Sequence, residues 1–232
     1  MRLLVTRPQP DAERTAAALR ARGHAVAIAP LLATESIDFE LPDALPGAVV
    51  LTSANAARSV ARHSRRALLT ALPAFTVGAH TAEAARAAGF HDVHAADGDR
   101  LDLMRMLGER FGAGSRPLLY LSGEHRSGEL TGCAAPVVTV VVYRAHAADR
   151  FPPPVERALS ENWIDGVLHL SRRTVETYLD CAVRAGLLAR ALQPRHFCLS
   201  RQVAGPLVAA GAAGIRVASL PQETTLIDLV GT

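Results

Sequence analysis

The chain has 232 residues and a formal net charge of +3; 49% of its residues are hydrophobic and 20% are charged. These values are typical of a globular protein with one large or two small domains and exclude a disordered chain. All 25 basic residues are Arg, and the absence of Lys excludes Schiff-base enzymes and Walker-type phosphate loops. The small positive excess is dispersed and does not favour nucleic-acid binding.

Short apolar runs alternate with segments of helical periodicity along the whole chain. The clearest helix follows Ser171, where apolar side chains recur at positions 175, 178, 179, 182 and 183. The alternation predicts an α/β fold of parallel sheets with helices on both faces. The predicted strands, in chain order, are Leu3–Thr6, Ala25–Ala29, Ala48–Leu51, Ala74–Val77, Pro117–Leu121, Val137–Tyr143, Gly166–Leu170, His196–Leu199 and Ile215–Ala218.

Three segments are predicted to lie outside helices and strands. Thr34–Leu45, with prolines around it, and Pro152–Pro154 are predicted as connections between two lobes. The polar segment 91–99 is predicted as a loop. It contains His91 and His94 but lacks the helical His pair or the Cys set of common zinc sites, so we expect no metal.

Two pairs of segments are similar to each other within the chain. Leu51–Thr52–Ser53 precedes a predicted helix, as Leu168–Ser171 does. A second pair is offset by 122 residues and matches Gly78 with Ser200, Ala82 with Ala204 and Gly89 with Gly211. A repeat near half the chain length suggests two similar α/β lobes.

Small or hydroxyl-bearing residues follow most of the predicted strands, where ligands bind in parallel α/β sheets. Each begins or precedes a helix, so one interpretation is plain N-capping. The other is an anion-binding surface built from the N–H groups of several helix N-termini. Both interpretations stay open for Thr6, Thr52–Ser53, Gly78, Ser122–Gly123, Ser171 and Ser200.

Three further side chains are candidates for binding or chemistry. Arg7 and Arg126 follow strands and are placed to bind a carboxylate or phosphate, or else to pack on the surface. Tyr143 ends the longest β-branched run. Its phenol could donate a proton to a leaving group, or the ring could simply pack at an interface.

Taken in order, the motifs resemble the uroporphyrinogen-III synthase family over almost the whole chain. In that family two flavodoxin-like lobes are joined by a two-stranded connector. The resemblance therefore implies a discontinuous first domain of residues 1–34 plus 148–232, a second domain of residues 39–142, and connectors at 34–39 and 142–148. The motifs that carry it are Leu4–Pro8 with Gly23 and Pro30, Leu51–Ala56, Val77–Gly78 with Thr81, Ala82 and Gly89, Leu121–Gly123 with Arg126, Val142–Arg144, Asp165–Gly166 with Ser171, and Leu199–Ser200 with Ala204 and Gly211.

The resemblance also implies a reaction. Family members need no cofactor or metal and convert hydroxymethylbilane, a linear polycarboxylate tetrapyrrole, into uroporphyrinogen III with loss of water and inversion of the terminal ring. Tyr143 would assist departure of the hydroxyl. The implied substrate-binding residues, in a cleft between the lobes, are Thr6, Arg7, Ser53, Ala54, Asn55, Gly78, Thr81, Ser122, Gly123, Arg126, Ser171 and Ser200.

We expect a monomeric cytoplasmic lyase that has no membrane or nucleic-acid partner and contacts hydroxymethylbilane synthase transiently. The N-terminus carries no secretory signal, and the three Cys share no metal or redox spacing. The alternative is a non-catalytic two-lobed binding protein for a small polyanionic ligand. It shares the fold and the strand-end chemistry, and only an assay of product formation separates the two.

Overall fold

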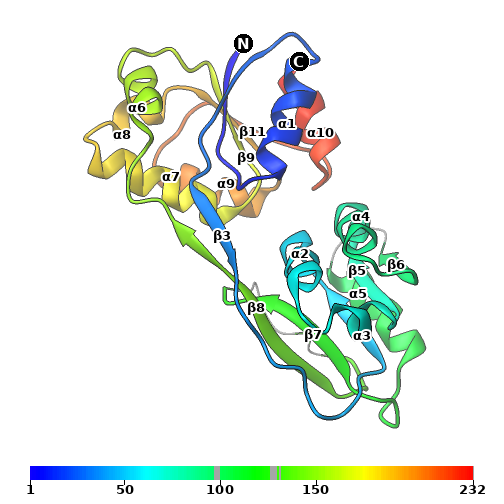
Figure 1. The fold of residues 1–232 in the computed structure, drawn as a ribbon. Helices are drawn as coiled ribbons and strands as arrows, with labels where there is room; N and C mark the ends of the chain where they lie inside the picture. Colours follow the sequence, from blue (N-terminus) through cyan, green and yellow to red (C-terminus); the bar gives the residue numbers. More distant parts are fainter. Residues whose placement is uncertain (97–99, 126–129, 131, 232) are drawn as a thin grey trace. The chain divides into compact units, whose positions relative to one another are not determined.

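The structure is a computed structural model that describes residues 1–96, 100–125, 130 and 132–231. Contacts divide the chain into two units, and each is described by itself. Unit 1 comprises Met1–Ala33 and His146–Thr232, whereas unit 2 comprises Thr34–Ala145. In Figure 1 the blue N-terminal elements and the yellow-to-red C-terminal elements belong to unit 1, and the cyan-to-green elements belong to unit 2.

Unit 1 is built on a five-stranded parallel sheet with the order β11-β10-β9-β1-β2. Its strands are β1 (Arg2–Val5), β2 (Ala25–Ile28), β9 (Gly166–His169), β10 (Arg195–Cys198) and β11 (Ile215–Val217). Its helices are α1 (Asp11–Arg20), α6 (Pro153–Ser160), α7 (Arg172–Arg184), α8 (Leu188–Ala191), α9 (Arg201–Ala209) and α10 (Glu223–Val230).

Both faces of this sheet are buried, which explains why its strands are nearly continuous apolar runs. Side chains alternate between the faces. Leu3 and Val5 of β1 pack in a cluster with α1 and α10, while Leu4 packs in a cluster with α6, α7 and α8. The helices therefore leave the sheet accessible mainly at the ends of its strands.

Unit 2 contains a six-stranded sheet with the order β3-β8-β7-β4-β5-β6. Its strands are β3 (Leu32–Ser36), β4 (Ala48–Leu51), β5 (Ala74–Val77), β6 (Val93–Ala96), β7 (Leu118–Gly123) and β8 (Val137–Ala147). Strands β4 to β8 pair in parallel. Its helices are α2 (Ala54–Arg62), α3 (Arg66–Thr70), α4 (Gly78–Ala88) and α5 (Arg100–Arg110).

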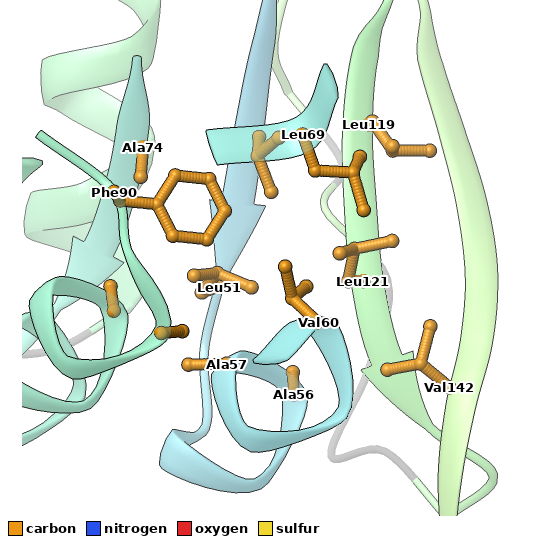
Figure 2. Close-up of a cluster of buried hydrophobic side chains, with 13 residues drawn as sticks. Leu51, Ala56, Ala57, Val60, Leu69, Ala74, Phe90, Leu119, Leu121 and Val142 are labelled. Atoms are coloured by element: carbon orange, nitrogen blue, oxygen red, sulfur yellow. The ribbon is translucent and has the colours of Figure 1, made fainter. Parts of the chain in front are cut away.

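The core of unit 2 lies in two layers. Figure 2 shows the layer on the α2 side, where Leu51 of β4 and Leu121 of β7 meet Val60 of α2. On the other face of the sheet, α5 packs its Leu103 and Leu107 on alternate residues of the same strands. As in unit 1, few polar side chains lie within the buried part of the sheet; Thr76 of β5 and Tyr120 of β7 are two of them.

Strands β3 and β8 carry the chain across the boundary between the units. The boundary falls at Ala33/Thr34 in β3 and at Ala145/His146 in β8. Hydrogen bonds of 2.9 Å join the Ile37 N–H to the Val142 carbonyl and the Ala148 N–H to the Leu31 carbonyl. Since one residue number rises as its partner's falls, this pair is antiparallel.

The strands of the two sheets lie in the same spatial order if those of unit 2 are counted from β7 instead of β4. Unit 1 runs β2-β1-β9-β10-β11 and unit 2 runs β8-β7-β4-β5-β6, beside which β3 is added. In unit 1 this order is 2-1-3-4-5, counted along the chain, and the order in unit 2 is its circular permutation. The segments that are similar in sequence occupy equivalent places: β4–α2 corresponds to β9–α7, and β5–α4 to β10–α9.

The predicted α/β class with parallel sheets is confirmed, but two strands were missed. The segment Thr34–Leu45, predicted as a connection, begins within β3, and the polar segment 91–99 contains β6. Both are edge strands whose polar residues hide their pattern. Among the described residues, no helix combines the length and apolarity needed to cross a bilayer.

Two histidines are fully buried in unit 1. His169 and His196 are 0% exposed, and the Nε2 atom of His169 lies 3.1 Å from the Nδ1 atom of His196. Their rings stack at 5.3 Å. Burial lowers the pKa of His196 to about 4 and that of His169 well below its ordinary value, with the neighbouring imidazole adding to the effect for His169. Both rings are therefore neutral in the folded protein.

We expect unit 1 to lose stability in mild acid. Between pH 6.5 and 4, His196 is protonated in the unfolded chain but stays neutral in the folded protein. The free energy of unfolding therefore falls by roughly 3 kcal/mol over this range. Urea unfolding at a series of pH values, followed by fluorescence of the single Trp, Trp163, measures this. His196→Leu should flatten the profile, whereas His125→Gln, which alters a 60% exposed side chain, should not. A wild-type profile that is flat over this range would contradict the prediction.

Candidate functional site

Three predicted strand-end serines cap helices. The Oγ atoms of Ser53, Ser171 and Ser200 accept hydrogen bonds of 3.2 to 3.3 Å from helix N–H groups of α2, α7 and α9. The N-capping interpretation is thus confirmed for these three serines. Each hydroxyl keeps its own proton to donate, so binding of an anion at the same helix ends stays a prediction.

Four other predicted residues lie in the first turns of two unit 2 helices. Ala54 and Asn55 begin α2, where the Asn55 Oδ1 atom accepts a 2.8 Å hydrogen bond from Arg58. Gly78 begins α4 with φ of 72°, a conformation that favours glycine, and a Cβ there would meet nothing within 4 Å. Thr81 is only 4% exposed, so its side chain is part of the core.

Thr6 and Arg7 follow β1, but their side chains are engaged within unit 1. The Thr6 hydroxyl is fully buried and donates to the Leu168 carbonyl. The Arg7 guanidinium lies 2.9 Å from Glu223 and 3.6 Å from Asp11, and it donates to Thr15. Arg7 therefore ties the end of β1 to α1 and α10, which is a structural role.

Glu223 is the main partner of Arg7. Burial acts to raise the pKa of Glu223, but Arg7, Thr15 and Arg14 outweigh it, and the pKa lies below its ordinary value. The carboxylate is thus charged at neutral pH.

Tyr143 lies over the end of the neighbouring strand. It pairs with Gly123 at a register irregularity between β7 and β8. A Cβ on Gly123 would come within 2.6 Å of Tyr143 Cζ and within 2.8 Å of its hydroxyl. Only glycine therefore allows the phenol to occupy this position against β7.

Burial raises the pKa of Tyr143 above its ordinary value, and the nearby Tyr120 adds to the rise. The side chain of Ser53, at the N-terminus of α2, is close enough to the phenol to oppose this rise. The phenol is consequently neutral at physiological pH. A neutral phenol can donate a hydrogen bond or a proton to a leaving group.

Tyr120 belongs to the same strand ends and was not predicted. It is 3% exposed, and its hydroxyl lies 3.0 Å from Oγ1 of Thr52, the residue before Ser53. A signal was available, because a Tyr within an otherwise aliphatic strand needs a polar partner for its hydroxyl. Ser122, two residues further along β7, is 2% exposed, and its hydroxyl has no partner among the described residues.

The described part of unit 2 thus brings together Ser53, Ser122, Gly123 and Tyr143. Thr6, Arg7, Ser171 and Ser200 lie at the strand ends of unit 1. Arg126 lies outside the described residues. Among those that are described, no group of three or more His, Cys, Asp or Glu residues could hold a metal ion.

A cavity of about 520 Å³ in unit 1 contains none of the predicted residues. Met1, Asp165 and Arg195 line it. They lie at the amino ends of β1, β9 and β10, the opposite end of the sheet from the candidate residues.

We expect the Arg7 ion pairs to contribute to stability. Arg7→Met would remove one of the two guanidinium groups that contact the largely buried Glu223, together with the contact to Asp11, and the free energy of unfolding should fall by about 1 to 2 kcal/mol. Arg20→Met is the matched control, since Arg20 and its partner Glu13 are 44% and 58% exposed; its cost should stay below about 0.5 kcal/mol. Urea unfolding of both variants measures the difference, and equal losses would rule out the structural role of Arg7.

Comparison with known proteins gives a consistent result. The family model "Uroporphyrinogen-III synthase HemD" matches residues 13–230. The uroporphyrinogen-III synthetase of Helicobacter pylori is 14% identical, with a TM-score of 0.64 over 99% of this chain and 98% of that one. A mutant uroporphyrinogen III synthase of Thermus thermophilus is 18% identical, with a TM-score of 0.56 over 100% of this chain and 96% of that one.

At these identities the two structures show a shared fold. No curated protein matches the chain in sequence. The family model, however, covers nearly the whole chain, and the predicted resemblance is confirmed: the chain belongs to the uroporphyrinogen-III synthase family.

Proposed function

We propose that this chain, a member of a family of tetrapyrrole-biosynthesis enzymes, is a lyase that cyclises hydroxymethylbilane to uroporphyrinogen III, with loss of water and inversion of the terminal ring. The observation that supports this most is the neutral Tyr143 phenol, held against Gly123 and close to Ser53 at the N-terminus of α2. A proton donor at a strand end beside free helix N–H groups suits a polycarboxylate substrate with a hydroxyl to lose.

In the proposed reaction the C–O bond of the terminal hydroxymethyl group breaks first. The Tyr143 phenol gives its proton to the departing hydroxide, so that water leaves and an azafulvenium cation forms beside the phenolate. The cationic methylene carbon bonds to the substituted α-carbon of the terminal pyrrole, which gives a spiro intermediate. The bond from that α-carbon to its original methylene bridge then breaks, and the released methylene bonds to the free α-carbon of the same ring, which is thereby inverted. The proton released when the pyrrole regains aromaticity returns to the phenolate, and no cofactor or metal takes part.

The larger part of catalysis in this proposal is geometric. The linear substrate can also close without inversion of its terminal ring. The main task of the enzyme is therefore to hold the substrate in the conformation that leads to inversion, rather than to supply a reactive group. Backbone N–H groups at the N-termini of α2, α4, α7 and α9, capped by Ser53, Ser171 and Ser200, would hold the carboxylates.

The product isomer tests this proposal. Hydroxymethylbilane is generated by its own synthase, the protein is added, and the type I and type III isomers are resolved after oxidation. Type III in excess over the protein-free control is the expected result. Type I alone, at the level of the control, would reject the lyase and leave the alternative of a binding protein for polyanions.

Removal of the Tyr143 hydroxyl should lower turnover. We expect Tyr143→Phe to reduce kcat roughly a hundredfold, because proton donation to the leaving hydroxyl is lost, while KM changes little. Tyr178→Phe is the matched control: its hydroxyl donates to the Ala191 carbonyl in the core of unit 1, so stability should fall while kcat stays. An unchanged kcat in Tyr143→Phe would remove this phenol from the mechanism.

The position of the phenol can be tested separately from its chemistry. Gly123→Ala would place a methyl group 2.6 Å from the Tyr143 ring and force the ring aside. Because a displacement of about 1 Å can cost orders of magnitude in rate, we expect kcat to fall roughly tenfold to hundredfold. Gly112→Ala, where a Cβ meets nothing within 4 Å, should leave kcat unchanged. Equal rates in both variants would show that Gly123 does not set the phenol position.

A further inference from the structure

Arg144 carries a buried polar atom that the proposed reaction does not yet use. Its Nε atom is inaccessible to solvent and has no hydrogen-bond partner among the described residues. Nor does any described carboxylate form an ion pair with this half-buried guanidinium. A buried donor without an acceptor costs free energy, so its presence calls for a partner that the described part of the ligand-free chain does not contain.

A second unsatisfied atom lies on the adjacent strand. The Ser122 hydroxyl of β7 is 98% buried and has no partner within the described part of the chain. Ser122 precedes Gly123, and Arg144 follows Tyr143, the residue paired with Gly123. Since side chains alternate along strands, both point away from the face that the Tyr143 ring covers. Diagonal positions on neighbouring strands are within reach of a long side chain.

The chemistry of these two groups defines the ligand. The Nε and one Nη atom of a guanidinium form a fork that matches the two oxygens of a carboxylate, and a serine hydroxyl can donate to the same group. Of the two arginines predicted to bind, Arg7 is the one that the structure describes, and its charge is already neutralised by Glu223 and Asp11. Arg144 is therefore a better carboxylate ligand than Arg7.

We infer that Arg144 and Ser122 form a carboxylate subsite at the ends of β7 and β8, on the face of the sheet opposite the Tyr143 ring. This rests on the proposed function, in which the substrate is a polycarboxylate. The fork of Arg144 binds one side-chain carboxylate of the substrate, and Ser122 donates a further hydrogen bond to it. The bond fixes one part of the substrate at the strand ends from which Tyr143 also projects.

Stability without ligand separates this role from a structural one. Arg144→Met removes a buried donor that has no partner, so the Tm of the ligand-free protein should stay the same or rise. Arg7→Met, which breaks internal ion pairs, should lower it. A loss of Tm in Arg144→Met as large as that in Arg7→Met would overturn the inference.

Kinetics and binding provide the second test. We expect Arg144→Met to raise KM for hydroxymethylbilane roughly tenfold or more and to abolish the thermal stabilisation of the protein by uroporphyrin III. Arg144→Lys keeps the charge without the fork and should be intermediate. Arg62→Met, which alters an exposed arginine at the end of α2, is the matched control and should resemble the wild type.

A double-mutant cycle tests whether the two residues share one carboxylate. Ser122→Ala alone should raise KM a few-fold, and its effect should shrink in the Arg144→Met background. If the wild type makes only type I isomer, the proposed function fails. If the wild type makes type III but Arg144→Met matches Arg62→Met in KM, this inference alone fails.

Discussion

Burial of both faces of each parallel sheet is the constraint on which the remaining structure depends. Helices cover the faces, so Leu3 and Val5 point to one apolar cluster and Leu4 to another. Polar groups are left to the strand ends, where helix N-termini also gather. The candidate functional groups of this chain are therefore helix-capping residues, glycines and single side chains at the edge of an aliphatic core.

Both units have helix N-termini at their strand ends, but the side chains that lie next to these strand ends differ. Ser53 and Ser171 cap equivalent helices, and β8 is the equivalent of β2. Only β8 brings a phenol to the strand end, where Gly123 makes room for it. In unit 1 the corresponding strand ends in Ile28. Proton donation is consequently expected from unit 2 alone, whereas anion binding can be divided between both.

Much of the fold could be predicted because its determinants are local. Apolar runs such as Ala48–Leu51 and the caps at Ser53 and Ser171 are visible in the sequence. The edge strands β3 and β6 could not be found this way, since polar residues such as Glu35 and His94 interrupt their apolar pattern. At the site, the strand-end positions were predictable but the pairing of Arg7 with Glu223 was not. Those two residues are more than 200 positions apart, and only the folded sheet brings them together.

The circular permutation has a consequence for synthesis on the ribosome. Unit 2 is a single stretch, Thr34–Ala145, and is complete while β9, β10 and β11 are still missing. Strands β1 and β2 leave the ribosome first but lack the neighbour β9 on which β1 packs. Since domains fold as units during translation, the second unit to begin is the first to be finished. The N-terminal β1–α1–β2 segment waits, with its apolar faces uncovered, until about the last third of the chain arrives.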